Sequence, residues 1–128
     1  MTIAHAIARF DTLYPNVFPY AEKLRWLSVL DGQIFQDIVS VYPENAGRTF
    51  DGYGIGTDKQ TELLAPFPHD DIYIKYLAAQ SDKINSDVAR YVNSAAVFNA
   101  AYSEFAAFYN RTHLAAKRRF VSFDSEGE

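Results

Sequence analysis

The chain contains no cysteine among its 128 residues. Disulfide bonds and thiolate metal sites are therefore excluded, and this composition is compatible with the cytoplasm. No stretch of about 18 consecutive apolar residues occurs, so we expect no membrane-spanning helix and no membrane partner. The opening residues, MTIAHA, also lack the basic and apolar regions of a secretory signal peptide.

Basic residues are outnumbered as well. Twelve Lys and Arg stand against sixteen Asp and Glu, which gives a net charge of −4 and an isoelectric point of about 5.3. A protein that binds nucleic acid through its overall charge needs a basic surface. The sequence therefore predicts no specific nucleic-acid binding.

A nucleotide-binding motif is missing too. The glycines of GYGIG at residues 52–56 have the spacing of neither the dinucleotide fingerprint nor the P-loop. No Gly-Lys-Ser/Thr follows them, so a mobile loop explains these glycines better than a phosphate site. We expect no cofactor.

Reactive side chains do not gather at spacings typical of a catalytic or metal site. His5, His69 and His113 have no second ligand at a metal-binding spacing. Asp70 and Asp71 are adjacent, so on a helix they point about 100° apart and cannot act as an opposed acid–base pair. We expect no metal and no enzymatic activity, with a site assembled from distant residues as the competing interpretation.

What the chain does contain is apolar and aromatic residues, at 48% and 16% of the sequence. That content can fill the core of one domain, which we place at residues 1–128. Large aromatics dominate both cores and interfaces, so their surplus indicates that some of them serve an interface.

Hydrophobic periodicity predicts an all-α fold, a small bundle of about four helices. The expected helices span residues 3–13, 19–41, 69–91 and 95–113, and polar Asn93 and Ser94 separate the last two. The positions expected on their apolar faces are Ile3, Ile7, Phe10, Leu24, Leu27, Leu30, Ile34, Ile38, Val41, Ile72, Tyr76, Ile84, Val88, Tyr91, Phe98, Ala101, Tyr102, Phe105 and Tyr109. Trp26 is expected to be largely buried.

A long loop or a short β-hairpin is expected between the second and third helices, over residues 43–67. A short strand at residues 61–64 could pair with residues 49–50. Its glycines predict that residues 47–59 are mobile in the free protein. Gly32, inside the second helix, is either a tolerated cost of about 1 kcal/mol or marks the close approach of another backbone.

The end of the chain carries its one basic cluster. Lys117, Arg118 and Arg119 precede Phe120, and residues 114–128 are predicted to form a flexible C-terminal tail. The cluster is a solvated helix end that complements the helix dipole, a docking segment with Phe120 and Phe123 as apolar anchors, or, as a third alternative, a contact to DNA. We take Lys117, Arg118, Arg119 and Phe120 as the candidate interface for a partner or for another copy.

Three segments of the sequence resemble small head–tail connector, or head-completion, proteins of tailed phages and prophages. Together the matching motifs span most of the chain, over residues 15–113. They are EKLRWL and LDGQI at residues 22–27 and 30–34, ELLAP and DDIY at residues 62–66 and 70–73, and NSAAVFNAAY and YNR at residues 93–102 and 109–111.

The resemblance implies a structural virion-assembly protein that forms a homo-oligomeric ring on the portal vertex. Its implied partners are the portal protein and tail-completion proteins, and it could touch DNA non-specifically in the channel. The implied location is the virion, and the bacterial cytoplasm during assembly. The alternative function is a helical protein-interaction or regulatory module unrelated to virions.

Overall fold

The computed structural model describes the backbone of residues 1–126 and the side chains of residues 1–113. The described backbone forms α1 (Ile3–Leu13), α2 (Tyr20–Ile34), α3 (Ile72–Ile84) and α4 (Val88–Glu126). A π-helical turn, η1 (Phe35–Val39), extends α2, and 3-10 turns form at η2 (Pro43–Asn45) and η3 (His69–Asp71). The predicted all-α bundle of four helices is confirmed.

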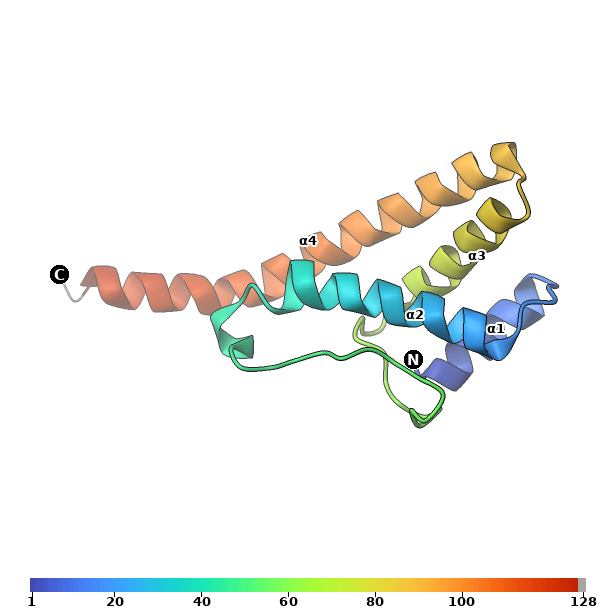
Figure 1. Cartoon of the computed structure of the whole chain (residues 1–128). Helices are drawn as coiled ribbons and strands as arrows, with labels where there is room; N and C mark the ends of the chain where they lie inside the picture. Colours follow the sequence, from blue (N-terminus) through green and yellow to red (C-terminus); the bar gives the residue numbers. More distant parts are fainter. Residues whose placement is uncertain (127–128) are drawn as a thin grey trace.

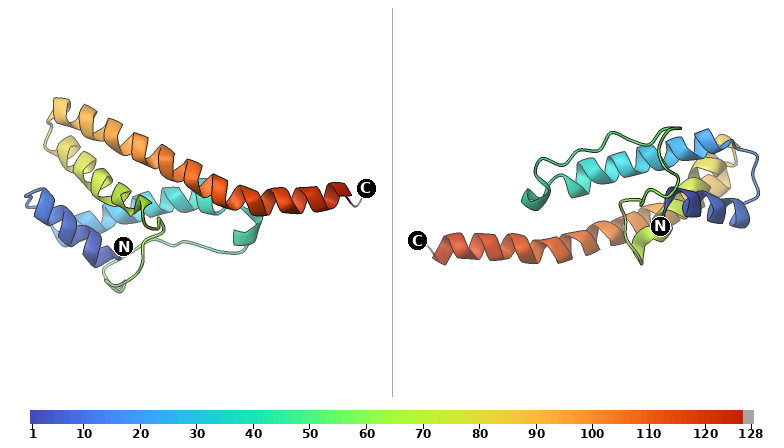
Figure 2. Two further views of the ribbon diagram at one scale, coloured as in Figure 1. Left: turned by 180° about the vertical axis from the view of Figure 1, so that it is seen from behind. Right: turned by 90° about the horizontal axis from the view of Figure 1, so that it is seen from below.

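Helix α3 lies at the centre of the arrangement (Figure 1). It packs against α1 and α2 on one side and against α4 on the other. Helix α4 runs antiparallel to α3 and then continues past the other helices towards the C-terminus, as both views in Figure 2 show. No helix in the described part of the chain combines the length and the apolarity that crossing a membrane requires.

The first two helices follow the sequence pattern closely. Thr2 caps α1 by accepting a hydrogen bond from the backbone N–H of His5 at 3.1 Å. Trp26 is only 6% exposed and packs edge-to-face on Phe18, with ring centroids 5.1 Å apart, so its predicted burial is confirmed. The fully buried residues on these two helices are Ile3, Ala6, Phe10, Leu27, Leu30, Asp31 and Ile34.

The π-helical turn changes the face that the end of the second helix presents. An i→i+5 turn holds more residues than an α-helical turn, so the side chains that follow it are rotated relative to an uninterrupted helix. Consecutive residues Ile38 and Val39 are both buried, whereas Val41 is 58% exposed and Tyr42 takes its place in the core. The predicted burial of Val41 was therefore wrong.

The break between the third and fourth helices lies eight residues before the predicted one. Ser86 adopts a positive φ of 58°, and the Asp87 side chain accepts a hydrogen bond from the N–H of Arg90 at 3.1 Å. That bond caps the first turn of α4, so Asn93 and Ser94 lie inside the helix. Ile84 and Val88, predicted to be buried, are 50% and 73% exposed, because they flank this turn as the last residue of α3 and the first residue of α4.

Residues 46–65, which we call the loop segment, form no strand in the described structure. The expected hairpin between residues 49–50 and 61–64 is not formed. Glu62 instead makes a single antiparallel bridge with Thr2, and the Leu63 N–H donates to the Met1 carbonyl at 2.9 Å. The N–H of Ile3 likewise donates to the Thr61 carbonyl at 3.0 Å, so this end of the loop segment is bound to the start of α1.

Candidate interaction surfaces

A buried carboxylate, Asp31 of α2, accepts hydrogen bonds from the loop segment. Asp31 is fully buried and accepts hydrogen bonds from the hydroxyls of Tyr53 at 2.5 Å and Tyr73 at 2.6 Å. The N–H of Leu64 donates to it at 3.1 Å, and the N–H of Ala65 donates to the Tyr73 hydroxyl at 2.7 Å. This Asp31 network joins α2, α3 and two points of the loop segment.

Burial sets the protonation behaviour of this network. Loss of water raises the pKa of Asp31, and hydrogen bonds from Tyr53, Tyr73 and Leu64 lower it by less. Burial, together with the charge of Asp31, raises the pKa of both tyrosines far above the usual range. The two phenols therefore stay protonated and act as hydrogen-bond donors.

A glycine allows the loop segment to lie close to α2. Gly52 has φ of +90°, and a Cβ placed on it would lie 2.8 Å from the Ser28 hydroxyl oxygen. That oxygen accepts a hydrogen bond from the N–H of Tyr53 at 2.9 Å. The glycines led us to expect a mobile segment, but one of them is what permits its attachment.

A second polar network forms where α4 leaves the bundle. The Tyr42 hydroxyl donates to Asn110 at 2.6 Å, and the Asn45 amide donates to the Tyr109 hydroxyl at 3.0 Å. The His113 ring stacks on Tyr109 with centroids 3.7 Å apart, and its Nε2 lies 3.4 Å from a carboxylate oxygen of Glu44. These contacts hold α4 against the end of the second helix, just before the segment that projects.

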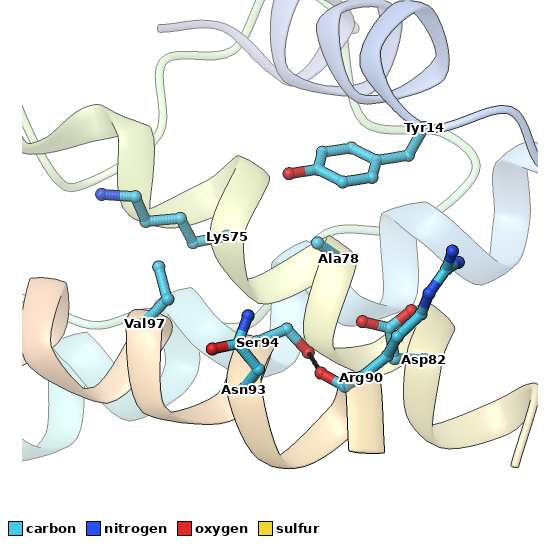
Figure 3. Close-up of a pocket in the computed structure, with 8 residues that line it drawn as sticks. All are labelled: Tyr14, Lys75, Ala78, Asp82, Arg90, Asn93, Ser94 and Val97. Atoms are coloured by element: carbon cyan, nitrogen blue, oxygen red, sulfur yellow. Dashed lines mark hydrogen bonds between the residues drawn. The ribbon is translucent and has the colours of Figure 1, made fainter. Parts of the chain in front are cut away.

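A groove opens between the end of α1, the exposed side of α3 and the first half of α4 (Figure 3). It has a volume of about 190 Å³. Its lining residues are Tyr14, Lys75, Ala78, Asp82, Arg90, Asn93, Ser94 and Val97. Lys75 pairs with Asp71 at 2.8 Å, and Arg90 lies 3.5 Å from Asp87. The charged groups of the groove are therefore Lys75, Arg90 and Asp82, and its apolar lining is contributed by Ala78 and Val97.

Large apolar side chains are exposed at the same end of the molecule. The connection between α1 and α2 meets the connection between α3 and α4 there, where Val17 and Asn85 line one shallow hollow. The exposed residues at this end are Leu13, Tyr14, Val17, Ile84, Val88 and Val92. Such a concentration is typical of a surface that another protein covers.

The interface residues predicted from the sequence lie beyond the described side chains. Lys117, Arg118, Arg119 and Phe120 belong to the part of α4 of which only the backbone is described. The groove and the Asp31 network were not predicted, because their members are scattered along the chain. The local signal for the network was Asp31, an acidic residue among the apolar residues Leu27, Leu30 and Ile34 of its helix.

The residues that the structure describes include no group of three or more His, Cys, Asp or Glu side chains that could hold a metal ion. Comparisons of the chain with protein-family models, with curated proteins and with solved structures found no match.

Proposed function

We propose that the chain is a structural assembly protein, a head–tail connector of a tailed phage or prophage. In this role it binds the portal protein, closes into a ring on the portal vertex and offers a platform to tail-completion proteins. The proposal is supported by the sequence resemblance, which covers residues 15–113, and by the described surfaces.

The observation that carries the proposal is the length and direction of α4. The helix has 39 residues, which corresponds to about 58 Å at 1.5 Å per residue. Its last turns project beyond the other helices (Figures 1 and 2). A helix whose backbone extends past its own bundle is available for contact with another molecule.

Closure of a ring requires two different, complementary patches on each subunit. The chain offers separate surfaces of this kind. The basic end of α4 lies at one end of the molecule, and the groove of Figure 3 with the exposed apolar residues lies at the other. This separation favours head-to-tail contacts over a symmetric pair.

The test is binding to the portal protein encoded in the same genome. Native mass spectrometry and electron microscopy of the mixture should show rings of this chain on the portal oligomer. The absence of binding at both low and moderate salt would refute the connector function. A chain that stays monomeric in that experiment would favour the alternative, an interaction module unrelated to virions.

Deletion of residues 117–128 is the variant that tests the projecting end. We expect the shortened protein to keep its helical circular dichroism and to bind the portal more weakly. Deletion of residues 124–128 alone is the matched control, since it removes acidic residues and keeps Lys117, Arg118, Arg119 and Phe120. Equal portal binding by both deletion variants and the full chain would remove the docking function from this segment.

A further inference from the structure

A histidine lies between two parts of the chain at the point where α4 leaves the bundle. The His113 ring lies 5.5 Å from the Tyr42 ring, and its Nε2 lies 3.4 Å from a carboxylate oxygen of Glu44 in the turn η2. On its own helix the ring stacks on Tyr109, with centroids 3.7 Å apart and planes 5° from parallel. The His113 side chain is 29% exposed, so protons from the solvent can reach it.

The contacts of the other ring nitrogen determine which neutral form of His113 fits. Nδ1 lies 2.8 Å from the Tyr109 carbonyl oxygen, and a carbonyl only accepts hydrogen bonds, so Nδ1 carries a proton and donates. The Thr112 hydroxyl, 3.0 Å from Nδ1, has its own acceptors in the carbonyls of Phe108 and Tyr109. A neutral imidazole carries a single N–H group. In the neutral ring, Nε2 therefore has no proton and points a lone pair towards Glu44.

Protonation of His113 reverses the character of the Glu44 contact. The imidazolium has an N–H group at Nε2 as well as at Nδ1, so it can donate to Glu44 and keep its bond to the Tyr109 carbonyl. The added positive charge is attracted to the carboxylate and to the face of the Tyr109 ring. Histidine is the side chain that ordinarily changes charge between pH 5 and 8. The geometry therefore opposes one protonation state of the ring and favours the other.

Among the described side chains, Glu44 and Tyr42 face the His113 ring from the adjoining segment, and Tyr109 faces it from α4 itself. Carboxylic acids ionise near pH 4 and phenols near pH 10. Burial, with the charges of Tyr109 and Glu44, raises the pKa of Tyr42 further. Arg48, the cation of residues 42–48, stays charged throughout. A change of charge at this contact between pH 5 and 8 is therefore assigned to His113.

We propose that His113 is a pH-sensitive latch between α4 and the turn η2. When the ring is protonated, Nε2 donates to Glu44 and fixes η2 against α4. When the proton is lost, this hydrogen bond is lost too and the attachment of η2 weakens, so the contribution is present at low pH and falls as the pH rises. The latch lies directly before the part of α4 that projects from the bundle (Figure 1), so it sets how firmly the base of that projection is held.

The position of the proton in the neutral ring is the first test. Two-bond ¹H–¹⁵N correlation spectra of the full chain at pH 8 identify the protonated nitrogen in each of the three histidines, and His113→Gln assigns the signal. We expect the His113 proton on Nδ1. A neutral ring with its proton on Nε2 could donate to Glu44 without any change of charge, and this result would overturn the latch.

Hydrogen exchange of the adjoining turn is the second test, because it reports the local attachment of η2 without unfolding of the domain. The N–H groups of Ala46 and Arg48 close this turn, each through a 3.1 Å hydrogen bond. We expect their protection, corrected for the intrinsic pH dependence of exchange, to be roughly threefold higher at pH 5.5 than at pH 8, the effect of a solvent-exposed ion pair. Equal protection at the two pH values would likewise overturn the proposal.

Two substitutions assign the effect to this pair of side chains. Glu44→Gln removes the negative charge and His113→Gln removes the titrating ring, so each should abolish the difference in protection between pH 5.5 and pH 8. Glu104→Gln and His5→Gln make the same chemical changes at exposed positions of α4 and α1 and should keep the difference. A difference that survives in Glu44→Gln, or that disappears in the control variants as well, would contradict the latch.

Discussion

The Tyr73 hydroxyl donates a 2.6 Å hydrogen bond to Asp31, and both side chains are fully buried. The same hydroxyl accepts the Ala65 N–H at 2.7 Å. One oxygen of α3 therefore connects a buried charge on α2 to the backbone of the loop segment. Removal of this oxygen takes the hydrogen bond from Oδ1 of Asp31 and from the Ala65 N–H, whereas Oδ2 of Asp31 keeps its bonds from Tyr53 and Leu64.

We predict that Tyr73→Phe lowers the free energy of unfolding by about 2–3 kcal/mol, since a hydrogen bond to a buried charged group is lost. Urea unfolding followed by circular dichroism measures this change. Tyr102→Phe is the matched control, because the Tyr102 hydroxyl is buried without a hydrogen-bond partner in the described structure. That variant should be neutral or more stable, and a similar loss in both variants would contradict the proposed importance of the network.

The raised pKa of Asp31 predicts how stability depends on pH. Because the folded state holds the Asp31 proton more tightly than the unfolded chain, this group favours folding most at pH values below its unfolded pKa, about 3.9. The contribution is lost as the pH rises through the folded pKa. The stability of the wild type relative to Asp31→Asn should therefore fall from about pH 4 towards pH 7. Urea unfolding of both proteins across this range checks the sign, and a relative gain with rising pH would contradict it.

Gly52 and Gly54 should respond differently to alanine. In Gly52→Ala the new Cβ would meet the Ser28 hydroxyl at 2.8 Å in a left-handed backbone conformation, so we expect a loss of about 1–3 kcal/mol. A Cβ on Gly54 would meet nothing within 4 Å, so Gly54→Ala should be neutral or stabilising by up to about 1 kcal/mol. Thermal unfolding of Gly52→Ala and Gly54→Ala measures the difference in stability. Equal melting temperatures of the two variants would contradict the close packing of the loop segment on α2 at Gly52.

Gly32→Ala should stabilise the protein by about 0.5–1 kcal/mol, because alanine favours a helix interior more than glycine does. The structure decides between the two explanations that the sequence left open for Gly32. A Cβ at this position would lie 3.9 Å from the Phe50 ring, which is ordinary contact with a side chain and not a close backbone approach. Destabilisation in a urea titration would indicate that Phe50 packs more closely on α2.

Asp87→Ala should cost about 0.5–2 kcal/mol, because the N–H of Arg90 loses the side-chain acceptor that caps α4. Asp82→Ala, on the neighbouring turn of α3, is the control, since the Asp82 side chain makes no hydrogen bond or ion pair with described residues. Chemical denaturation of the two variants should separate them, and equal stabilities would mean that the cap contributes little.

Periodic segments were predictable because their signal is local. Leu24, Leu27, Leu30 and Ile34 recur at helical spacing, and the structure buries all four. The break before α4 was misplaced because Asn93 and Ser94 resemble a turn as much as residues 85–87 do. What distinguishes the true break is the Asp87 cap, a hydrogen bond that the sequence offers but does not identify.

The attachment of the loop segment could not be predicted from a local pattern. Asp31 lies 22 residues from Tyr53 and 42 from Tyr73, and no spacing rule joins such positions. The π-helical turn was missed for a related reason, since its inserted residue is apparent only once Ile38 and Val39 are both seen to be buried. The basic cluster at residues 117–119 was found because it is contiguous.

The central position of α3 has a consequence for how the molecule opens. The first half of α4 rests mainly on α3, whereas α3 also supports α1 and α2. Amide hydrogens in residues 88–100 should therefore exchange with solvent through a partial opening, in which α4 separates while the other three helices stay together. Amides of α3 should exchange only when the whole domain unfolds, and the slowest exchange rates of the chain should coincide there.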